Sequence, residues 1–517
     1  MKRASEQRYR SKVLLPGLWS FTAVVAIYVP GAIRRSAWSD DLVFLSTTDC
    51  DICYGAARPI EAVAIRALFH SIDSLVLVRC IGVLGIAMLA ATLAISLVRW
   101  GVPRTRATLW AIASVLLPSF HSFAGWANAF LKPWAALLGV LAGLLWVENT
   151  EQKKHIRRLA AYIGLIIALF LYPPSAMFCW VYLGLRILVL RTQSRRAFRQ
   201  LISMTCLVSL SMGTFLLISL INRYINDTSL SYRLGIINTY SGEPAVYQIL
   251  EKLFWFASHP IVIATRLFWI SSPSAFNALV IGGPILLCIA FVLISRHQEP
   301  LQNPILSLII YTVILTFSGL THLLVWENQF DYRFFGGLSV LMFAYIAVTG
   351  KQLLSIGMSI FLKRVNSKLT NSFESFLIIS SLIVVVLGGC LSITNIDRVF
   401  IEPFQTKERY IQEVLHDFDP ELHSQIIAIS EPSLYPSRSH LGSYSTVTDL
   451  AHPWVPAPSI RLVLREFHEI TNPVRILVRP DGMWPPPRLT ETDFIVDFRP
   501  YADSLRGCPI RRGMGPA

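Results

Sequence analysis

The sequence is poor in charged residues. Only 15% of its 517 residues are Asp, Glu, Lys or Arg, and 53% are hydrophobic, whereas globular chains carry about 25% charged residues. These proportions exclude an ordinary soluble enzyme. The shortage is greatest before residue 395, because residues 395–517 contain 29 of the 78 charged residues and 15 of the 29 prolines. The chain therefore has two parts suited to different solvents.

Cysteine is also scarce, with eight residues in the chain. Most lie in apolar runs, where cysteine packs as a small hydrophobic residue. Cys50 and Cys53 form a Cys-x-x-Cys pair outside these runs, but a second pair and a thioredoxin-like context are both missing. A local disulfide in an oxidising compartment is the favoured interpretation, and a free pair is the alternative.

Nucleic-acid recognition motifs are absent from the sequence, despite a formal net charge of +14. Residues 1–394 contain 33 basic and 16 acidic residues, whereas residues 395–517 contain 13 and 16. The excess positive charge thus belongs to the apolar part, where it is typical of cytoplasmic loops. We expect the lipid bilayer as a partner and no nucleic acid.

Long apolar runs fill the first 394 residues. A bilayer-spanning helix needs roughly 20 mainly apolar residues. The fold class expected is therefore an α-helical polytopic membrane protein with about 11 transmembrane helices. The predicted spans lie at residues 14–33, 74–98, 108–120, 134–147, 159–171, 175–190, 201–221, 276–294, 305–325, 336–350 and 374–394.

The segments that connect these spans are alternately rich and poor in Lys and Arg. One set of connections holds 21 of them in 76 positions, and the other holds 10 in about 120. The rich set includes the N-terminus, which is therefore expected in the cytoplasm. An odd number of spans then places the C-terminal residues outside, in the periplasm or at the surface of a bacterial inner (cell) membrane.

Residues 395–517 are predicted to form a small extracytoplasmic α/β domain, separate from the transmembrane domain 1–394. A helix is expected at Thr406–Asp417, and short β-rich apolar runs follow it at Gln425–Ile429, Val474–Val478 and Phe494–Phe498. No catalytic motif is apparent in this region. An accessory role is expected.

Unusual polar residues gather in the external loops 34–73, 222–275 and 326–335, whereas the spans have almost no charge at mid-depth. A transporter usually keeps ionisable groups near the midplane. In the first loop Asp40 and Asp41 are adjacent. One carboxylate can act as a general base while its neighbour orients the acceptor or helps to hold a divalent cation; the alternative is a solvated helix cap.

Three features of the first loop carry a resemblance: Ser39-Asp40-Asp41, then Arg58-Pro59, then a span that begins at Ser74. With them the chain resembles the GT-C class of integral-membrane glycosyltransferases, and within it the bacterial glucosyltransferase-II-like family that converts O-antigen serotype on lipopolysaccharide. Ala57 stands where that family has Gly before the Arg-Pro. The motif-specific match covers about residues 35–100.

The resemblance implies transfer of a glucose-like hexose from a polyprenyl-phosphate donor to a cell-envelope glycan on the periplasmic face, with inversion. Asp40 or Asp41 would be the base, and the same pair would hold Mg²⁺ or Mn²⁺ if a metal takes part. Cationic side chains would bind the donor phosphate, and the candidates are Arg58, Arg333, Lys132 and Arg266. A salt bridge from Arg333 to Asp331 or Glu327 is its alternative role.

Other residues of the external loops are expected to line the cavity or meet the acceptor, namely Glu327, Asp331 and His121, although a lone His is more often merely interfacial. In loop 222–275, apolar residues recur at helical spacing over Ala245–Ala257, which predicts a helix lying flat on the outer leaflet. In GT-C enzymes such helices wall the donor groove. Simple anchoring is the alternative.

Two further functions remain open from the sequence. A transporter or flippase of lipid-linked glycans would also have many spans, but internal repeats and matched broken helices are not evident. A polymerase of envelope polysaccharide usually has a large Arg-rich external loop, and loop 222–275 has only three Arg and one Lys. A non-catalytic scaffold that presents residues 395–517 to an envelope partner is a third possibility.

Overall fold

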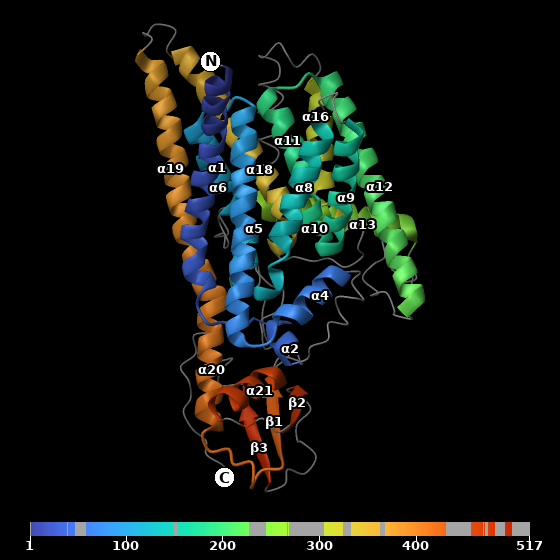
Figure 1. Ribbon diagram of the computed structural model, residues 1–517, viewed down its shortest axis with the longest axis vertical. Helices are drawn as coiled ribbons and strands as arrows, with labels where there is room; N and C mark the ends of the chain where they lie inside the picture. Colours follow the sequence, from blue (N-terminus) through green and yellow to red (C-terminus); the bar gives the residue numbers. More distant parts are fainter. Residues whose placement is uncertain are drawn as a thin grey trace.

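The computed structural model describes residues 2–38, 40–46, 58–148, 154–226, 244–265, 267, 304–323, 332–361, 368–430, 456–468, 470, 474–480 and 492–498. The protein is mostly helical, with a small sheet near its C-terminus (Figure 1). The N-terminus of α1 and the sheet lie at opposite ends of the long axis. The architecture is consistent with a helical polytopic membrane protein.

The described residues form the following helices. Those of the first half are α1 (Lys2–Ala32), α2 (Asp40–Ser46), α4 (Pro59–Leu68), α5 (Ile72–Arg99), α6 (Arg104–Val115), α7 (Pro118–Gly125), η1 (Ala127–Ala129), α8 (Lys132–Val147), α9 (Lys154–Leu171), α10 (Pro173–Ala176), α11 (Phe178–Leu190) and α12 (Ser194–Asn226). Those that follow are α13 (Ala245–Ser258), α14 (Pro260–Thr265), α16 (Pro304–Ser318), α17 (Leu320–Leu323), η2 (Tyr332–Phe334), α18 (Gly336–Phe361), α19 (Lys368–Ile396), η3 (Asp397–Ile401), α20 (Glu402–Leu415) and α21 (Pro456–Phe467).

Seven helices in the described ranges are long and apolar enough to cross a membrane, or up to eight if the bent pair α6 and α7 is counted as one span. Each of these coincides with a predicted span. Among the remaining predictions, 159–171 lies in α9, which begins with charged residues, and 305–325 overlaps the shorter apolar helix α16. The predicted span 276–294 lies outside the described residues.

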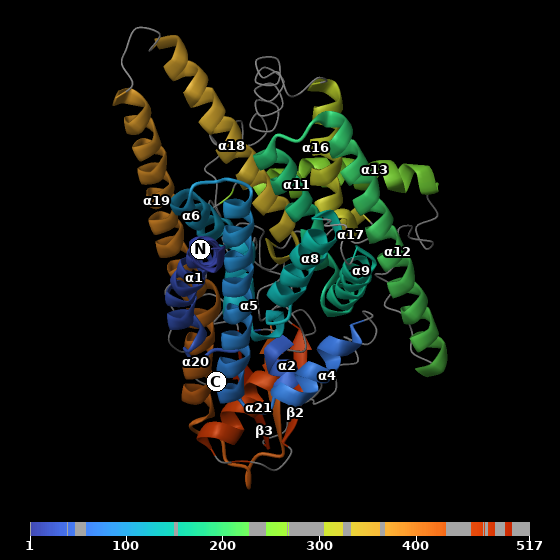
Figure 2. The ribbon, with the colours of Figure 1, turned by 45° about the horizontal axis from the view of Figure 1, so that its top comes forward.

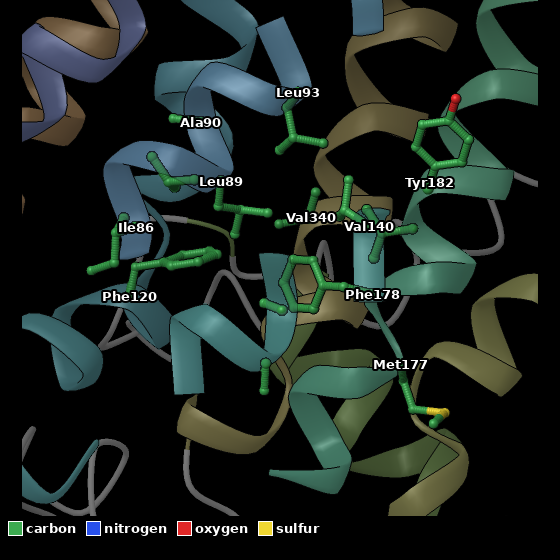
Figure 3. Packing of buried hydrophobic residues seen from close by; sticks show 14 of the residues in the cluster. Ile86, Leu89, Ala90, Leu93, Phe120, Val140, Met177, Phe178, Tyr182 and Val340 are labelled. Carbon is green, nitrogen blue, oxygen red and sulfur yellow. The ribbon is translucent and has the colours of Figure 1, made fainter. Parts of the chain in front are cut away.

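The main core forms where α5 packs against α1, α6 and α8. Leu89 and Leu93 of α5 are buried in one cluster with Phe120 of α7 and Phe178 of α11 (Figure 3). α8 also approaches α10 closely, since a Cβ at Gly139 would lie 2.5 Å from the carbonyl oxygen of Ala176. Only glycine permits this contact, which fixes α8 beside the short helix α10.

α6 and α7 meet at a bend of 66°, and Pro118 begins α7. Because the helix breaks here, the carbonyl oxygen of Leu116 has no backbone N–H donor from a following helical turn. The Nε2 atom of His121 lies 2.9 Å from this oxygen and 2.8 Å from Ser392 Oγ. His121 is buried, and these contacts stabilise the break.

α13 is a helix at the residues expected from the sequence, and it runs crosswise to α12 (Figure 2). Its apolar residues Val246, Leu250 and Phe254 are exposed, at 69%, 59% and 74%. The opposite side is buried against the bundle through Lys252 and Trp255. The predicted apolar stripe therefore faces away from the protein, as a membrane-surface helix requires.

The C-terminal residues contain a three-stranded parallel sheet in the order β2-β1-β3, made of β1 (Gln425–Ser430), β2 (Arg475–Pro480) and β3 (Asp493–Asp497). The ends of these strands lie within two residues of the predicted runs. Parallel neighbours need a crossover, and α21 lies between β1 and β2 in the chain. Ile411 of α20 and Ile460 of α21 are buried with Ile426 of β1.

The expected domain boundary at residues 394 and 395 falls inside continuous helix. α19, the π-helical η3 and α20 form one segment from Lys368 to Leu415. The composition changes here because Asp397 and Arg398 begin a charged stretch. The change in composition indicates that the two parts of the chain lie in different solvents. The backbone hydrogen bonds of the helix nevertheless continue through residues 394 and 395.

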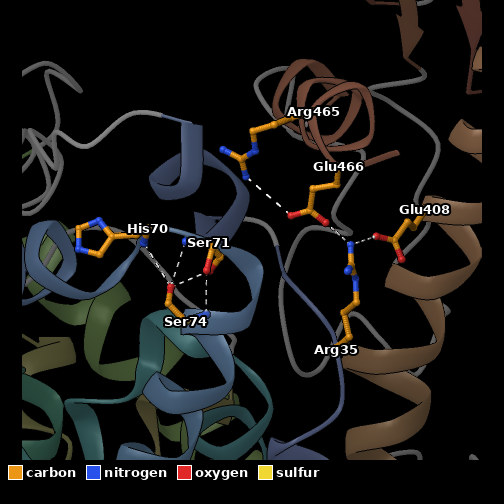
Figure 4. Close-up of polar contacts among 7 residues, drawn as sticks. All are labelled: Arg35, His70, Ser71, Ser74, Glu408, Arg465 and Glu466. Atoms are coloured by element: carbon orange, nitrogen blue, oxygen red, sulfur yellow. Dashed lines mark hydrogen bonds and ion pairs between the residues drawn. The ribbon is translucent and has the colours of Figure 1, made fainter. Parts of the chain in front are cut away.

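The C-terminal helices contact the segment that follows α1. The Arg35 guanidinium is 2.8 Å from Glu408 of α20 and also pairs with Glu466 of α21 (Figure 4). Arg34 pairs with Asp397. Phe404 and Leu462 share a buried cluster with Leu42 and Phe44 of α2. The sheet region is therefore packed on the loop that carries Asp40 and Asp41.

Candidate functional site

Arg79 of α5 fixes the path of the chain between α1 and α2. Its side chain is fully buried. Nε, Nη2 and Nη1 donate to the carbonyl oxygens of Ala32, Arg34 and Ser36, at 3.0, 2.6 and 2.5 Å. A guanidinium offers donors in a rigid fork, so one side chain binds the carbonyls of three alternate residues at the end of α1 and just after it. This positions the start of α2.

Asp41 is completely buried. Its carboxylate accepts from the backbone N–H of Trp38 at 3.0 Å, of Ala127 at 3.3 Å and of Asn128 at 2.7 Å. Burial raises the pKa of Asp41 to about 7, against the effect of the amide donors and of Arg79. The carboxylate thus joins α2 to the start of η1, and its oxygens are occupied by the backbone. Its role is structural.

We predict that Asp41→Asn destabilises the protein by about 1–3 kcal/mol. Both carboxylate oxygens accept N–H groups, so either orientation of the amide places its NH₂ against a backbone donor. The free energy of unfolding in detergent measures the effect. Asp73→Asn, at an exposed residue in the first turn of α5, is the control; the loss of its interaction with the helix N-terminus should cost no more than about 0.3–1 kcal/mol. Equal stability of the two variants would contradict the assigned role.

Asp40 has a different environment from its neighbour. It is the first residue of α2 and is partly exposed. The side-chain Nδ2 of Asn128 lies 3.4 Å from Asp40 Oδ2, and Asp40 is within electrostatic reach of Glu61 and Lys132. Of the two predicted carboxylates, Asp40 is therefore the one that can be reached from outside.

Arg58, Glu61 and Lys132 form the charged centre of the site. Arg58 precedes α4 and pairs with Glu61 at 2.6 Å, where the side chains are 20% and 1% exposed. Burial raises the pKa of Glu61, and Arg58 and Lys132 oppose this. Lys132, at the start of α8, is 3% exposed. The structure thus brings two of the predicted phosphate ligands together.

Aromatic rings separate the cations. Lys132 Nζ lies 4.8 Å from the ring centroids of both Trp126 and Tyr172. Arg333 lies over Trp126 at 4.4 Å, and Arg58 lies 5.9 Å from the centroid of Tyr172. Each cation therefore contacts the face of a ring. Arg333, a third predicted phosphate ligand, belongs to the same cluster.

The cluster brings three basic and two acidic side chains together in a largely buried place. Arg58, Lys132 and Arg333 lie near the carboxylates of Asp40 and Glu61, and burial lowers the pKa of Lys132 to about 7. Within the described ranges, Trp126 Nε1 and Asn128 Oδ1 are also buried without a hydrogen-bond partner. The cluster is suited to binding an anionic group with hydroxyls, such as a phosphosugar.

Three predicted site residues, Arg266, Glu327 and Asp331, lie outside the described residues, as do Cys50 and Cys53. The structure therefore gives no position for the predicted partner acids of Arg333.

A divalent cation held jointly by Asp40 and Asp41 does not fit the geometry. Asp41 is fully buried and already accepts three backbone N–H groups, which use most of the acceptor sites of its two oxygens. The parts of the chain that the structure describes contain no group of three His, Cys, Asp or Glu placed to hold a metal ion. No catalytic step is therefore assigned to a metal ion.

Sequence reasoning missed Glu61 and Tyr172. Glu61 lies three residues after Arg58 on the buried side of α4, beside the buried Ala62 and Ile65. A single acid on the apolar side of a short amphipathic helix was the available signal. Tyr172 ends an apolar run before Pro173, and no sequence pattern assigns it to the site.

No protein-family model matches the chain, and no curated protein is detectably similar to it.

Proposed function

We propose that the chain is a membrane-embedded glycosyltransferase. It moves a glucose-like hexose from a polyprenyl-phosphate donor to a cell-envelope glycan, such as the O-antigen of lipopolysaccharide, on the periplasmic face of the bacterial inner membrane. The proposal extends the GT-C resemblance of the first loop. The observation that supports it best is the partly exposed Asp40 beside the buried Lys132 and the Arg58–Glu61 ion pair.

Arg58, Lys132 and Arg333 would bind the donor phosphate. Hydrogen bonds between cations and phosphate are stronger than neutral ones, and their strength rises in a site that excludes water. Glu61 holds Arg58 in place through the ion pair at 2.6 Å. When the bond between the anomeric carbon and the phosphate oxygen breaks, the three cations stabilise the charge that develops on the leaving polyprenyl phosphate.

Asp40 would act on the acceptor. Its carboxylate removes the proton from the acceptor hydroxyl as that oxygen bonds to the anomeric carbon. Attack from the side opposite the phosphate inverts the configuration at this carbon. Trp126 and Tyr172, both buried, lie against the cations through their ring faces and keep them next to Asp40.

The test is sugar transfer by the full chain in proteoliposomes. Radiolabelled polyprenyl-phosphate hexoses are supplied as donors, and envelope glycan as the acceptor. We expect label in the glycan with at least one hexose, and an inverted linkage in the product. If a folded protein transfers no sugar but moves lipid-linked sugar across the bilayer, the proposal is wrong and transport takes its place.

We predict that Arg333→Gln lowers kcat/KM for the donor by about 10- to 100-fold, which corresponds to a lost charged hydrogen bond of roughly 1.5–3 kcal/mol. The KM of the acceptor should not change. Initial rates at varied donor and acceptor concentrations measure both. Arg66→Gln, at an exposed residue of α4, is the matched control. An effect confined to the acceptor would show that Arg333 does not bind the donor.

A further inference from the structure

A cationic cavity lies between α8, α9 and α12, at the end of the bundle opposite the sheet (Figure 1). Its volume is about 580 Å³, within the usual range for small-molecule sites. Four arginines dominate its lining, and none of the lining residues that the structure describes is acidic. The residues are Trp146, Val147, Arg158, Gln193, Arg195, Arg196, Arg199, Gln200 and Ser203.

The arginines occupy positions that are unfavourable without an anion. Arg158 lies near the start of α9, and Arg195, Arg196 and Arg199 lie in the first two turns of α12. The first turns of both helices contain no acidic residue. A helix N-terminus is itself positive, so cations there repel it whereas an anion is stabilised. Two such helix starts converge on one cavity.

Side chains inside the cavity are held in place. Trp146 Nε1 donates to the Ser203 carbonyl at 3.0 Å and to its hydroxyl at 2.9 Å. The Arg158 guanidinium lies 5.2 Å from the Trp146 ring centroid. Within the described ranges, Arg158 Nε is buried and lacks a hydrogen-bond partner. The cavity therefore contains an N–H donor with unused capacity, on a guanidinium that lies against Trp146.

Glu148, a neighbouring acid in the described residues, is engaged elsewhere. Its carboxylate accepts from Tyr182 Oη at 2.6 Å and from Trp100 Nε1 at 3.2 Å. It is not among the lining residues. Glu148 is therefore held away from the cavity by Tyr182 and Trp100.

We infer that this cavity binds a phosphate group, carried by an anionic phospholipid or supplied as free phosphate. Guanidinium groups match the geometry of phosphate oxygens, and basic pockets between membrane helices bind lipid head groups. The same turns of α9 and α12 expose Leu159, Phe198 and Ile202, which offer apolar surface for acyl chains. The inference does not depend on the proposed sugar transfer.

The experiment measures lipid binding to the full-length protein by native mass spectrometry in neutral detergent. Phosphatidylglycerol and phosphatidylcholine are added separately. Arg158→Gln and Arg196→Gln should each lower the affinity for phosphatidylglycerol about fivefold and leave that for phosphatidylcholine unchanged. Arg104→Gln makes the same charge change at an exposed residue outside the cavity, and should have no effect. Arg196 is exposed, so its replacement leaves the fold intact.

A second arm separates the two sources of phosphate. Thermal unfolding is followed in phosphatidylcholine nanodiscs, with inorganic phosphate or with chloride at equal ionic strength. Stabilisation of wild type by phosphate, lost in Arg196→Gln, would establish free phosphate as a ligand, whereas discrimination in the lipid arm alone would establish a head-group site. The inference is overturned if neither arm distinguishes Arg196→Gln from wild type, or if Arg104→Gln loses as much affinity.

Discussion

Sugar transfer by an Asp40→Asn variant is expected to fall by about 10²- to 10⁴-fold, the usual contribution of a general base. Asparagine cannot accept the proton of the acceptor hydroxyl at neutral pH. Its side-chain oxygen can still accept from Asn128 Nδ2, which lies 3.4 Å from Asp40 in the wild type, so the local structure should persist. The measurement is the initial rate of transfer in proteoliposomes at saturating donor.

Two controls accompany this variant. Asp73→Asn removes a nearby exposed carboxylate and should transfer sugar at the wild-type rate. The free energy of unfolding of Asp40→Asn should stay within about 0.5 kcal/mol of wild type, as for most surface substitutions. Transfer at the normal rate by Asp40→Asn would exclude this residue as the base. A large loss of stability instead would make its role structural.

Arg79→Met is expected to destabilise the protein by about 3–5 kcal/mol, as removing one partner of a buried charged network does. Methionine fills a similar volume but donates no hydrogen bond. The carbonyls of Ala32, Arg34 and Ser36 would lose their donor, and the buried Asp41 would lose its neighbouring cation. Denaturant titration in detergent measures the loss.

Arg79→Lys and Arg104→Met test the geometry of this interaction. Lysine keeps the charge but cannot reproduce the planar fork that reaches three carbonyls, so an intermediate loss is expected. Arg104→Met, at an exposed residue of α6, should leave stability nearly unchanged. If Arg79→Met were as stable as Arg104→Met, the loop that leads to Asp40 would have to be held by other contacts.

These predictions assign opposite roles to the adjacent carboxylates. The carboxylate of Asp41 is buried and accepts hydrogen bonds from the backbone N–H groups of Trp38, Ala127 and Asn128, so its substitution should affect folding. Asp40 is partly exposed beside the cations, so its substitution should affect chemistry. Measuring both rate and stability for each variant separates the two roles.

The C-terminal helices α20 and α21 also contact the loop between α1 and α2. Arg35 pairs with Glu408 and Glu466 (Figure 4), while Arg79 binds the backbone on either side of it. Leu42 of α2 is buried with Leu462 of α21. The loop that starts α2 is thus held by α5 on one side and by α20 and α21 on the other.

Local chemistry made several features predictable. Apolar runs specify helices that can cross a membrane, because an unpaired backbone group cannot remain in lipid. Seven of these runs are long apolar helices in the structure. The three β-rich runs near the C-terminus are strands, since short β-branched segments between turn residues leave few alternatives.

The sequence by itself determined the helical class, the strand positions and the residue types of Asp40, Arg58, Lys132 and Arg333. Only the tertiary structure decided which of them meet. It separated Asp40 from Asp41, added Glu61 and Tyr172, and used His121 to stabilise a helix break. These outcomes depend on contacts between segments far apart in the chain, such as Asp41 with Asn128, and the hydrophobic pattern of each segment carries no information about its partner.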